Sequence, residues 1–213
     1  PPTIDAGIER LIKPNTKMIC LEAPGTITME MQDVAGIAAV AKRLGVITMM
    51  DNTWASPLFF RPLEHGIDLS VEAVTKLLGG HSDLLMGSIS MLDSAFYECL
   101  RETQSILGQA VSPEDCFLVM RGMDTLQVRL NQQSRNTLKV ARWLETHPMV
   151  KEVMFPGLES NAGFALWKEQ FKGNGCLFSF ILEPAEESAF GAFFNALQHL
   201  PIGASWGGTH SLI

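Results

Sequence analysis

An apolar run, a helical stretch and a second apolar run follow one another within about thirty residues near the start of the chain. The first run covers residues 18–23, between Pro14-Asn15 and Pro24-Gly25, and the second covers residues 46–50. Between them, Asp33 can cap a helix over residues 34–44 that Gly45 would end. This order predicts a βαβ unit with a right-handed crossover. The near-continuous apolar runs favour a parallel sheet covered on both faces.

The rest of the chain continues this alternation. We expect strands over residues 69–75, 85–91, 150–155 and 176–182, and helices over residues 93–107, 113–121, 124–146, 163–171 and 186–199. The helix over 124–146 has a polar middle, as is typical of a helix that bridges two packed bodies. We therefore predict an α/β fold with a mostly parallel sheet. Residues 1–122 would be part of a large domain, and residues 123–213 the incomplete start of a smaller one.

Composition limits the possible partners of the chain. Hydrophobic residues make up 46% of the 213 residues and charged residues 18%, which is enough for a buried core. The 16 basic and 23 acidic residues give a net charge of −7 without a basic cluster, which argues against nucleic acid and against an anionic membrane surface. No apolar run approaches the length of a membrane span. These features favour a cytoplasmic protein.

The cysteines and histidines do not predict a metal site. Cys20, Cys99, Cys116 and Cys176 are scattered without a C-x-x-C pair, and Cys20 and Cys176 lie in apolar runs where we expect buried thiols. His81 and Asp83 stand two residues apart without a third ligand nearby in the sequence. Trp54 is expected in the core.

Lys76 and Asp51 stand where two strand-like runs give way to small and polar residues. The ends of buried parallel strands are where α/β enzymes hold their reactive groups. A poorly solvated lysine amine is suited to form a Schiff base, and an aspartate at a neighbouring strand end suits a protonated pyridine nitrogen. Taken alone, Lys76 would be interpreted as a surface lysine at the end of a strand. Taken alone, Asp51 would be interpreted as part of an Asp-Asn turn. Together they suggest pyridoxal 5'-phosphate (PLP).

Further runs of sequence support that interpretation. They are Leu21–Glu30, Met50–Ala55, Ala73–Lys76, Gly80–Asp83, Arg121–Leu126, Trp167-Lys168, Gly175–Phe180 and Ser205–Gly208. In order and spacing, and over essentially the whole chain, they resemble the transsulfuration (Cys/Met metabolism) family of PLP-dependent enzymes. The resemblance implies the aspartate-aminotransferase-like architecture called fold type I.

The resemblance also implies roles for individual residues. Lys76 would join PLP covalently and remove the Cα proton of the substrate, while Asp51 would keep the pyridine nitrogen protonated. Thr75 would offer its hydroxyl to the phosphate, and Thr26 would lie near the phenolic oxygen. Ala73 stands where the wider family usually has a serine, so one phosphate donor is missing.

Ser205-Trp206-Gly207-Gly208 bears on the type of reaction. Family members that act at the γ-carbon (cystathionine γ-synthases, cystathionine γ-lyases, methionine γ-lyases) usually have leucine after this serine, whereas β-acting members have tryptophan. By that resemblance, Ser205 and Trp206 would lie near the substrate carboxylate, although Trp206 could equally pack a strand end.

The expected activity is therefore a carbon–sulfur lyase of methionine biosynthesis. It would split L-cystathionine by β-elimination into homocysteine, pyruvate and ammonia. The alternatives are a γ-acting relative and a catalytically silent protein that keeps the fold. The resemblance also implies a homotetramer. It further implies a longer subunit, and the ends of the chain, Pro1 and the apolar Ser211-Leu212-Ile213, favour the same expectation.

Overall fold

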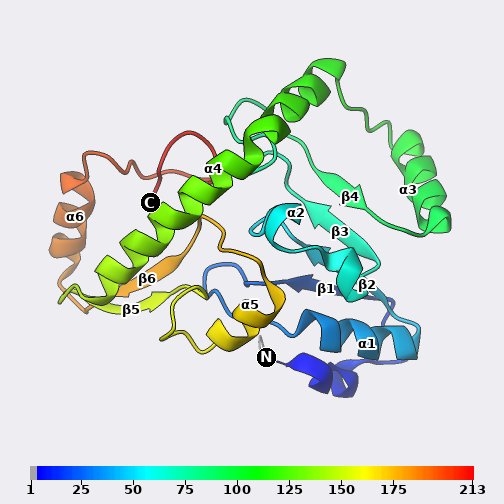
Figure 1. Ribbon diagram of the computed structural model, residues 1–213, viewed down its shortest axis with the longest axis horizontal. Coiled ribbons are helices and arrows are strands. Elements are labelled where there is room, and N and C mark those ends of the chain that lie inside the picture. The colour runs from blue at the N-terminus through cyan, green and yellow to red at the C-terminus, as the bar shows by residue number, and fades with distance from the viewer. Residues whose placement is uncertain (1–3) are drawn as a thin grey trace.

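A four-stranded sheet and a two-stranded sheet are connected by one long helix in the computed structural model, which describes residues 4–213 (Figure 1). The elements in chain order are η1 (Asp5–Leu11), β1 (Met18–Glu22), α1 (Val34–Leu44), β2 (Ile47–Asp51), α2 (Ser56–Phe59), η2 (Pro62–His65), β3 (Leu69–Glu72), β4 (Ser88–Ser90), α3 (Ser94–Ile106), α4 (Pro113–Glu145), β5 (Val150–Met154), α5 (Phe164–Gln170), β6 (Ser179–Leu182) and α6 (Glu187–Ala196).

The predicted βαβ unit is confirmed. Strands β1, β2 and β3 run parallel in that order, and β4 pairs antiparallel with β3. The Asp33 side chain accepts a hydrogen bond from the Gly36 N–H (3.0 Å), which starts α1. The helix ends at Gly45, whose φ of 67° is a left-handed conformation that glycine adopts without strain.

One face of strands β1 and β2 is open in residues 4–213, so the prediction of cover on both faces is wrong for these two strands. Buried and more exposed positions alternate along β1 and β2, as in a sheet with one covered face. Cys20 lies on the open face and is exposed, which contradicts its prediction as a buried thiol. Cys176 is largely buried, and this burial raises the pKa of its thiol to about 11.

Helix α4 is a single helix of 33 residues, so the predicted break between residues 121 and 124 is wrong. Gly122 lies inside the helix and is buried. A β-carbon there would stand 2.3 Å from the Gly79 carbonyl oxygen, so the glycine serves close packing rather than helix termination. Figure 1 shows α4 crossing from the side of β4 and α3 to the side of β5 and β6.

Three expected strands are at least three residues shorter than predicted, and the run over residues 176–182 pairs only at Ser179–Leu182. The run over residues 69–75 leaves the sheet after Glu72, and the run over 85–91 pairs only at Ser88–Ser90. Lys76 therefore does not close a strand. It lies in a turn in which the Lys76 N–H donates to the Ala73 carbonyl (2.9 Å) and the Gly79 N–H donates to the Val74 carbonyl (2.8 Å).

The main hydrophobic core draws on both sides of the predicted domain boundary. It includes Ile37 and Met50 from the first part of the chain and Phe155 and Phe171 from the second. The Trp54 ring is buried among them and packs edge-on against both phenylalanines, which confirms Trp54 as a core residue. The division at residues 122 and 123 stays a prediction.

Within residues 4–213, no helix combines the length and the apolar character that a membrane span requires.

Candidate active site

Lys76 meets the C-terminal segment, 129 residues further along the chain. Its Nζ donates a hydrogen bond to the Ser205 hydroxyl (2.5 Å) and lies 5.6 Å from the centroid of the Trp206 ring. A cation over an aromatic face is attracted by the ring electrons, so both neighbours hold the amine in place. In residues 4–213, no carboxylate forms an ion pair with Lys76. The amine is therefore free of a fixed counter-charge.

The Ser205–Gly208 loop lies directly on the Lys76 turn. A β-carbon at Gly207 would stand 3.3 Å from the Lys76 carbonyl carbon, and one at Gly208 would stand 2.0 Å from the Ser82 hydroxyl oxygen. Ser205 itself has a φ of 81°, a region that L-residues seldom occupy. Such strain persists where surrounding contacts impose it, often at functional sites. Here it places the Ser205 hydroxyl on the Lys76 amine.

Asp51 is exposed at the end of β2 and is fixed by Thr53. Asp51 Oδ1 accepts hydrogen bonds from the Thr53 hydroxyl (2.5 Å) and from the Thr53 N–H (2.9 Å). The Thr53 hydroxyl also accepts one from the Ala73 N–H (2.8 Å), at the start of the Lys76 turn. Thr53 thus connects the carboxylate at the end of β2 to the chain segment that carries the lysine.

Thr26 and Thr75 both have their hydroxyl hydrogens in use. The Thr26 hydroxyl donates to the Glu22 carboxylate at 2.6 Å, at the end of β1 beside Asp51. The Thr75 hydroxyl donates to the Met86 carbonyl (3.1 Å) and accepts from the Met86 N–H (2.9 Å). Each hydroxyl would have to turn from its present acceptor before it could donate to a ligand.

A buried carboxyl belongs to Glu72, the last residue of β3. Glu72 is only 6% exposed, and the one hydrogen bond that its carboxyl makes among the described residues comes from the Asn52 side-chain amide (3.2 Å). Burial raises the pKa of Glu72 to about 7; the Asn52 hydrogen bond lowers it and the Asp51 carboxylate raises it. Asn52 also donates to the Phe60 carbonyl (2.9 Å), so it joins β3 to the end of α2.

A cleft of about 420 Å³ opens beside Asp51 on the open face of the sheet. Glu22, Gln32 and Cys20 line it together with Asp51, whereas Lys76 does not. Three residues around this cleft and the Lys76 turn fit PLP in kind. Lys76 offers an amine for its aldehyde, Asp51 a carboxylate for its pyridine nitrogen and Thr75 a hydroxyl for its phosphate.

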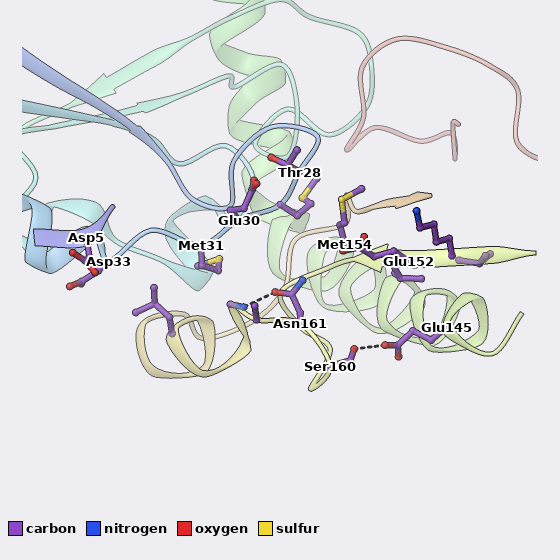
Figure 2. A pocket seen from close by; sticks show the side chains of 17 residues that line it. Asp5, Thr28, Glu30, Met31, Asp33, Glu145, Glu152, Met154, Ser160 and Asn161 are labelled. Atoms are coloured by element: carbon purple, nitrogen blue, oxygen red, sulfur yellow. Dashed lines mark hydrogen bonds between the residues drawn. The ribbon is translucent and has the colours of Figure 1, made fainter. Parts of the chain in front are cut away.

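A larger cleft, of about 860 Å³, lies elsewhere and has different chemistry (Figure 2). It is bounded by η1, the loop before α1, strand β5 and the loop before α5. Five carboxylates line it, those of Asp5, Glu30, Asp33, Glu145 and Glu152, and Lys151 is the one lysine or arginine in the lining. Such a lining repels the phosphate of PLP and the carboxylate of an amino acid. None of the predicted site residues lines this cleft.

Thr53 and Glu72 are the site residues that sequence reasoning missed. Thr53 follows Asp51 by two positions, the spacing at which an aspartate side chain commonly bonds to the backbone, so this contact had a sequence signal. Glu72 is a lone acid in the run Leu69–Val74, and a charge in an apolar strand is itself a signal. No cluster of three or more His, Cys, Asp or Glu side chains in residues 4–213 is arranged to hold a metal ion.

Comparison with known families and structures identifies relatives of the whole chain. Residues 1–213 match the family model described as Cys/Met metabolism PLP-dependent enzyme. The chain is 45% identical to a putative cystathionine beta-lyase of Rhizobium johnstonii, over 99% of this chain and 54% of that protein. It is 40% identical to the cystathionine beta-lyase MetC of Escherichia coli, over 100% of this chain and 54% of that one.

A solved structure with a similar fold is cystathionine gamma-lyase from Lactobacillus plantarum complexed with L-serine. Its TM-score is 0.92 at 33% identity, and the match covers 97% of this chain and 54% of that one. The chain thus spans about half the length of the proteins that it matches.

Proposed function

Because the chain belongs to the Cys/Met metabolism family of PLP-dependent enzymes, we propose that it carries the catalytic lysine of a carbon–sulfur β-lyase. Its α/β fold, with a mostly parallel sheet, is that of the fold type I enzymes in this family. The proposed reaction converts L-cystathionine and water into homocysteine, pyruvate and ammonia. Bound PLP supplies a conjugated ring that takes up the electron pair left when the Cα proton is removed.

The residues of the chain have separate parts in this proposal. Lys76 holds the cofactor through Nζ and moves the Cα proton of the substrate. Ser205, which accepts the hydrogen bond from Nζ, keeps the amine in place. Asp51 keeps the pyridine nitrogen protonated, and Thr53 fixes the Asp51 carboxylate.

The other predicted contacts need local rearrangement. Thr75 would donate to the phosphate after its hydroxyl turns from Met86, and Thr26 would approach the phenolic oxygen after turning from Glu22. Trp206 and Ser205 would border the substrate carboxylate.

The observation that carries the proposal is the meeting of Lys76 with Ser205 and Trp206. A protein that kept only the fold would not need a lysine amine held by a serine in a strained backbone conformation. The preference for β-elimination rests on tryptophan at position 206 and on the names of the relatives reported above.

Two other outcomes have specific support. A probable cystathionine gamma-synthase of Herpetosiphon aurantiacus is 39% identical over 86% of this chain, which keeps γ-carbon chemistry open. An L-alanine/L-glutamate racemase of Wolbachia pipientis is 40% identical over 100% of the chain. All three activities begin with removal of the Cα proton, so Lys76 has the same task in each.

Product identification separates these activities. The protein at its natural length, supplied with PLP and L-cystathionine, should release pyruvate and homocysteine in equal amounts. Release of 2-oxobutanoate and cysteine would assign γ-elimination. Conversion of L-alanine to D-alanine without cleavage of cystathionine would assign racemisation. Absence of all three products would refute the enzymatic proposal.

We also propose that the protein acts in the cytoplasm as a homotetramer. Large apolar side chains are exposed along α3 and the first half of α4, among them Ile106 (77%), Met120 (67%) and Phe117 (60%). Exposed apolar surface of this kind is typical of subunit contacts. Light scattering of the protein at its natural length tests the proposal, and a monomer at micromolar concentration would contradict it.

A further inference from the structure

The Lys76 turn has no regular secondary structure of its own. Its internal hydrogen bonds include those from the Gly79 N–H to the Val74 carbonyl and from the Gly80 N–H to the Lys76 carbonyl, both 2.8 Å. Outside the strands and helices, the position of such a turn depends on what packs against it. The Ser205–Gly208 loop lies against one part of the turn, and helix α4 lies against another.

Helix α4 touches the turn with its backbone. A β-carbon at Gly122 would stand 2.4 Å from the Leu78 carbonyl oxygen and 2.3 Å from the Gly79 carbonyl oxygen. Leu126 and Leu130, one and two turns further along α4, pack with Leu77 in a small buried cluster. Apolar packing therefore already attaches the turn to α4.

The Arg129 guanidinium lies at the same crossing and is held there by two hydrogen bonds within α4. Its Nη2 donates to the Gly122 carbonyl (2.7 Å) and its Nε donates to the Thr125 hydroxyl (3.0 Å). The guanidinium also lies against Gly80, where a β-carbon would stand 2.1 Å from Nη1. Gly80 has a φ of 75°, so both its backbone conformation and the adjacent guanidinium restrict this position to glycine.

No ion pair among the described residues stabilises the charge at this place. Arg129 forms no ion pair among residues 4–213, and its Nη1 is buried without a hydrogen-bond partner there. Partial burial lowers the pKa of the Arg129 guanidinium. An apolar side chain of similar length would fill the space without partly burying a charge. Stability alone therefore does not explain the arginine.

We propose that Arg129 is a positioning residue that fixes the Lys76 turn against α4 through Gly122 and Gly80. The inference rests on the proposed role of Lys76. Nε and Nη2 of the planar guanidinium donate to two acceptors on α4, and Nη1 lies against Gly80. The guanidinium therefore sets how closely the Lys76 turn approaches the helix. A lysine has one ammonium group and cannot reproduce this planar arrangement.

Three variants of the protein at its natural length test the proposal. Arg129→Met keeps the length of the side chain without its charge or its hydrogen bonds, and Arg129→Lys keeps the charge only. Arg135→Met is the matched control, because Arg135 is exposed on the same helix. The measurements are the melting temperature, hydrogen exchange at the Gly79 and Gly80 amides without PLP, and kcat and KM with PLP.

Arg129→Met should melt close to the temperature of the unaltered protein, because the loss of two hydrogen bonds within α4 is offset by the removal of a partly buried charge that has no ion pair. Exchange at Gly79 and Gly80 should be about tenfold faster, since the turn opens more often. We expect kcat to fall roughly 10- to 100-fold while KM changes about twofold or less, because a misplaced reactive group affects the reaction more than binding. In exchange and in kcat, Arg129→Lys should lie between the two proteins, and Arg135→Met should match the unaltered protein in every measurement.

The results that would overturn the proposal are distinct from those that would overturn the proposed function. Unchanged exchange and unchanged kcat in Arg129→Met would show that Arg129 does not position the turn. A lower melting temperature with a proportional loss of folded, active protein in both Arg129 variants would assign Arg129 a structural role only. If the unaltered protein neither binds PLP nor forms product, the proposed function fails, while the exchange measurement still decides whether Arg129 holds the turn.

Discussion

Replacement of Glu72 by glutamine should make the protein more stable at alkaline pH. Glu72 is buried at the end of β3, where only the Asn52 amide donates to its carboxyl and the nearby Asp51 carboxylate disfavours a second negative charge. Glutamine has nearly the same shape and stays neutral. The substitution therefore removes the cost of a buried charge and leaves the packing almost unchanged.

The pKa of Glu72 gives the size and the sign of the effect. It rises from 4.5, its ordinary value, to about 7 in the folded protein. At about 1.4 kcal/mol per pKa unit, ionisation of Glu72 costs the folded state on the order of 3 kcal/mol. The pKa of Glu72 is higher in the folded protein than in the unfolded chain. The stability that protonated Glu72 contributes is therefore fully present below pH 4.5 and is lost as the pH rises through 7.

Urea unfolding of the PLP-free protein at pH 5 and at pH 8 measures this difference. The free energy of unfolding of Glu72→Gln, relative to the unaltered protein, should be higher at pH 8 than at pH 5 by roughly 2–3 kcal/mol. Glu98→Gln is the control, because Glu98 is exposed on α3. Its effect should be small and equal at both pH values.

An equal effect of Glu72→Gln at both pH values would refute this reasoning. It would mean that the Glu72 carboxyl is solvated in the folded protein, or that it has a cationic partner. Destabilisation only at pH 8 would have the same meaning, because it would show that the ionised form is favoured.

Three more substitutions test the geometry of the site. Asp51→Asn should retain PLP but lower the rate of cystathionine cleavage by several orders of magnitude, because a neutral amide cannot stabilise the pyridinium charge. A near-normal rate would show that Asp51 has only a structural role in the turn after β2. Thr53→Val should reduce the free energy of unfolding by roughly 1–3 kcal/mol, because the Ala73 N–H and the Asp51 carboxylate each lose a hydrogen-bond partner. It should also weaken PLP binding in a spectroscopic titration. Thr53→Ser should restore both the stability and the binding. Gly122→Ala should lower the melting temperature although alanine favours helices, whereas Gly191→Ala in α6, which has open space around it, should raise or maintain it.

The local elements of the fold could be predicted because local signals define them. Asp33 and Gly45 mark the ends of α1 in the sequence, and each has the capping geometry that its residue type favours. The break expected near Gly122 failed because glycine has two uses. It ends helices, and it also lets two backbones touch, and only the tertiary structure shows that Gly122 has the second use.

The candidate site was only partly predictable. Its residues could be named from the resemblance, but the contact between Lys76 and Ser205 spans 129 residues and follows from the packing of two loops, which no local pattern encodes. The same holds for Cys20, whose apolar neighbours in sequence suggested burial although it lies on the open face of the sheet. Which face of a sheet is covered depends on segments far away in the chain.

The most direct test of the account is to find the lysine that PLP modifies. The protein at its natural length is mixed with PLP, reduced with borohydride, digested and analysed by mass spectrometry. We predict a pyridoxyl group on the peptide that contains Lys76. In Lys76→Ala, both this group and the yellow colour that bound PLP gives before reduction should be absent. A stoichiometric pyridoxyl group on another lysine, or none on Lys76, would contradict the central claim that Lys76 is the catalytic residue.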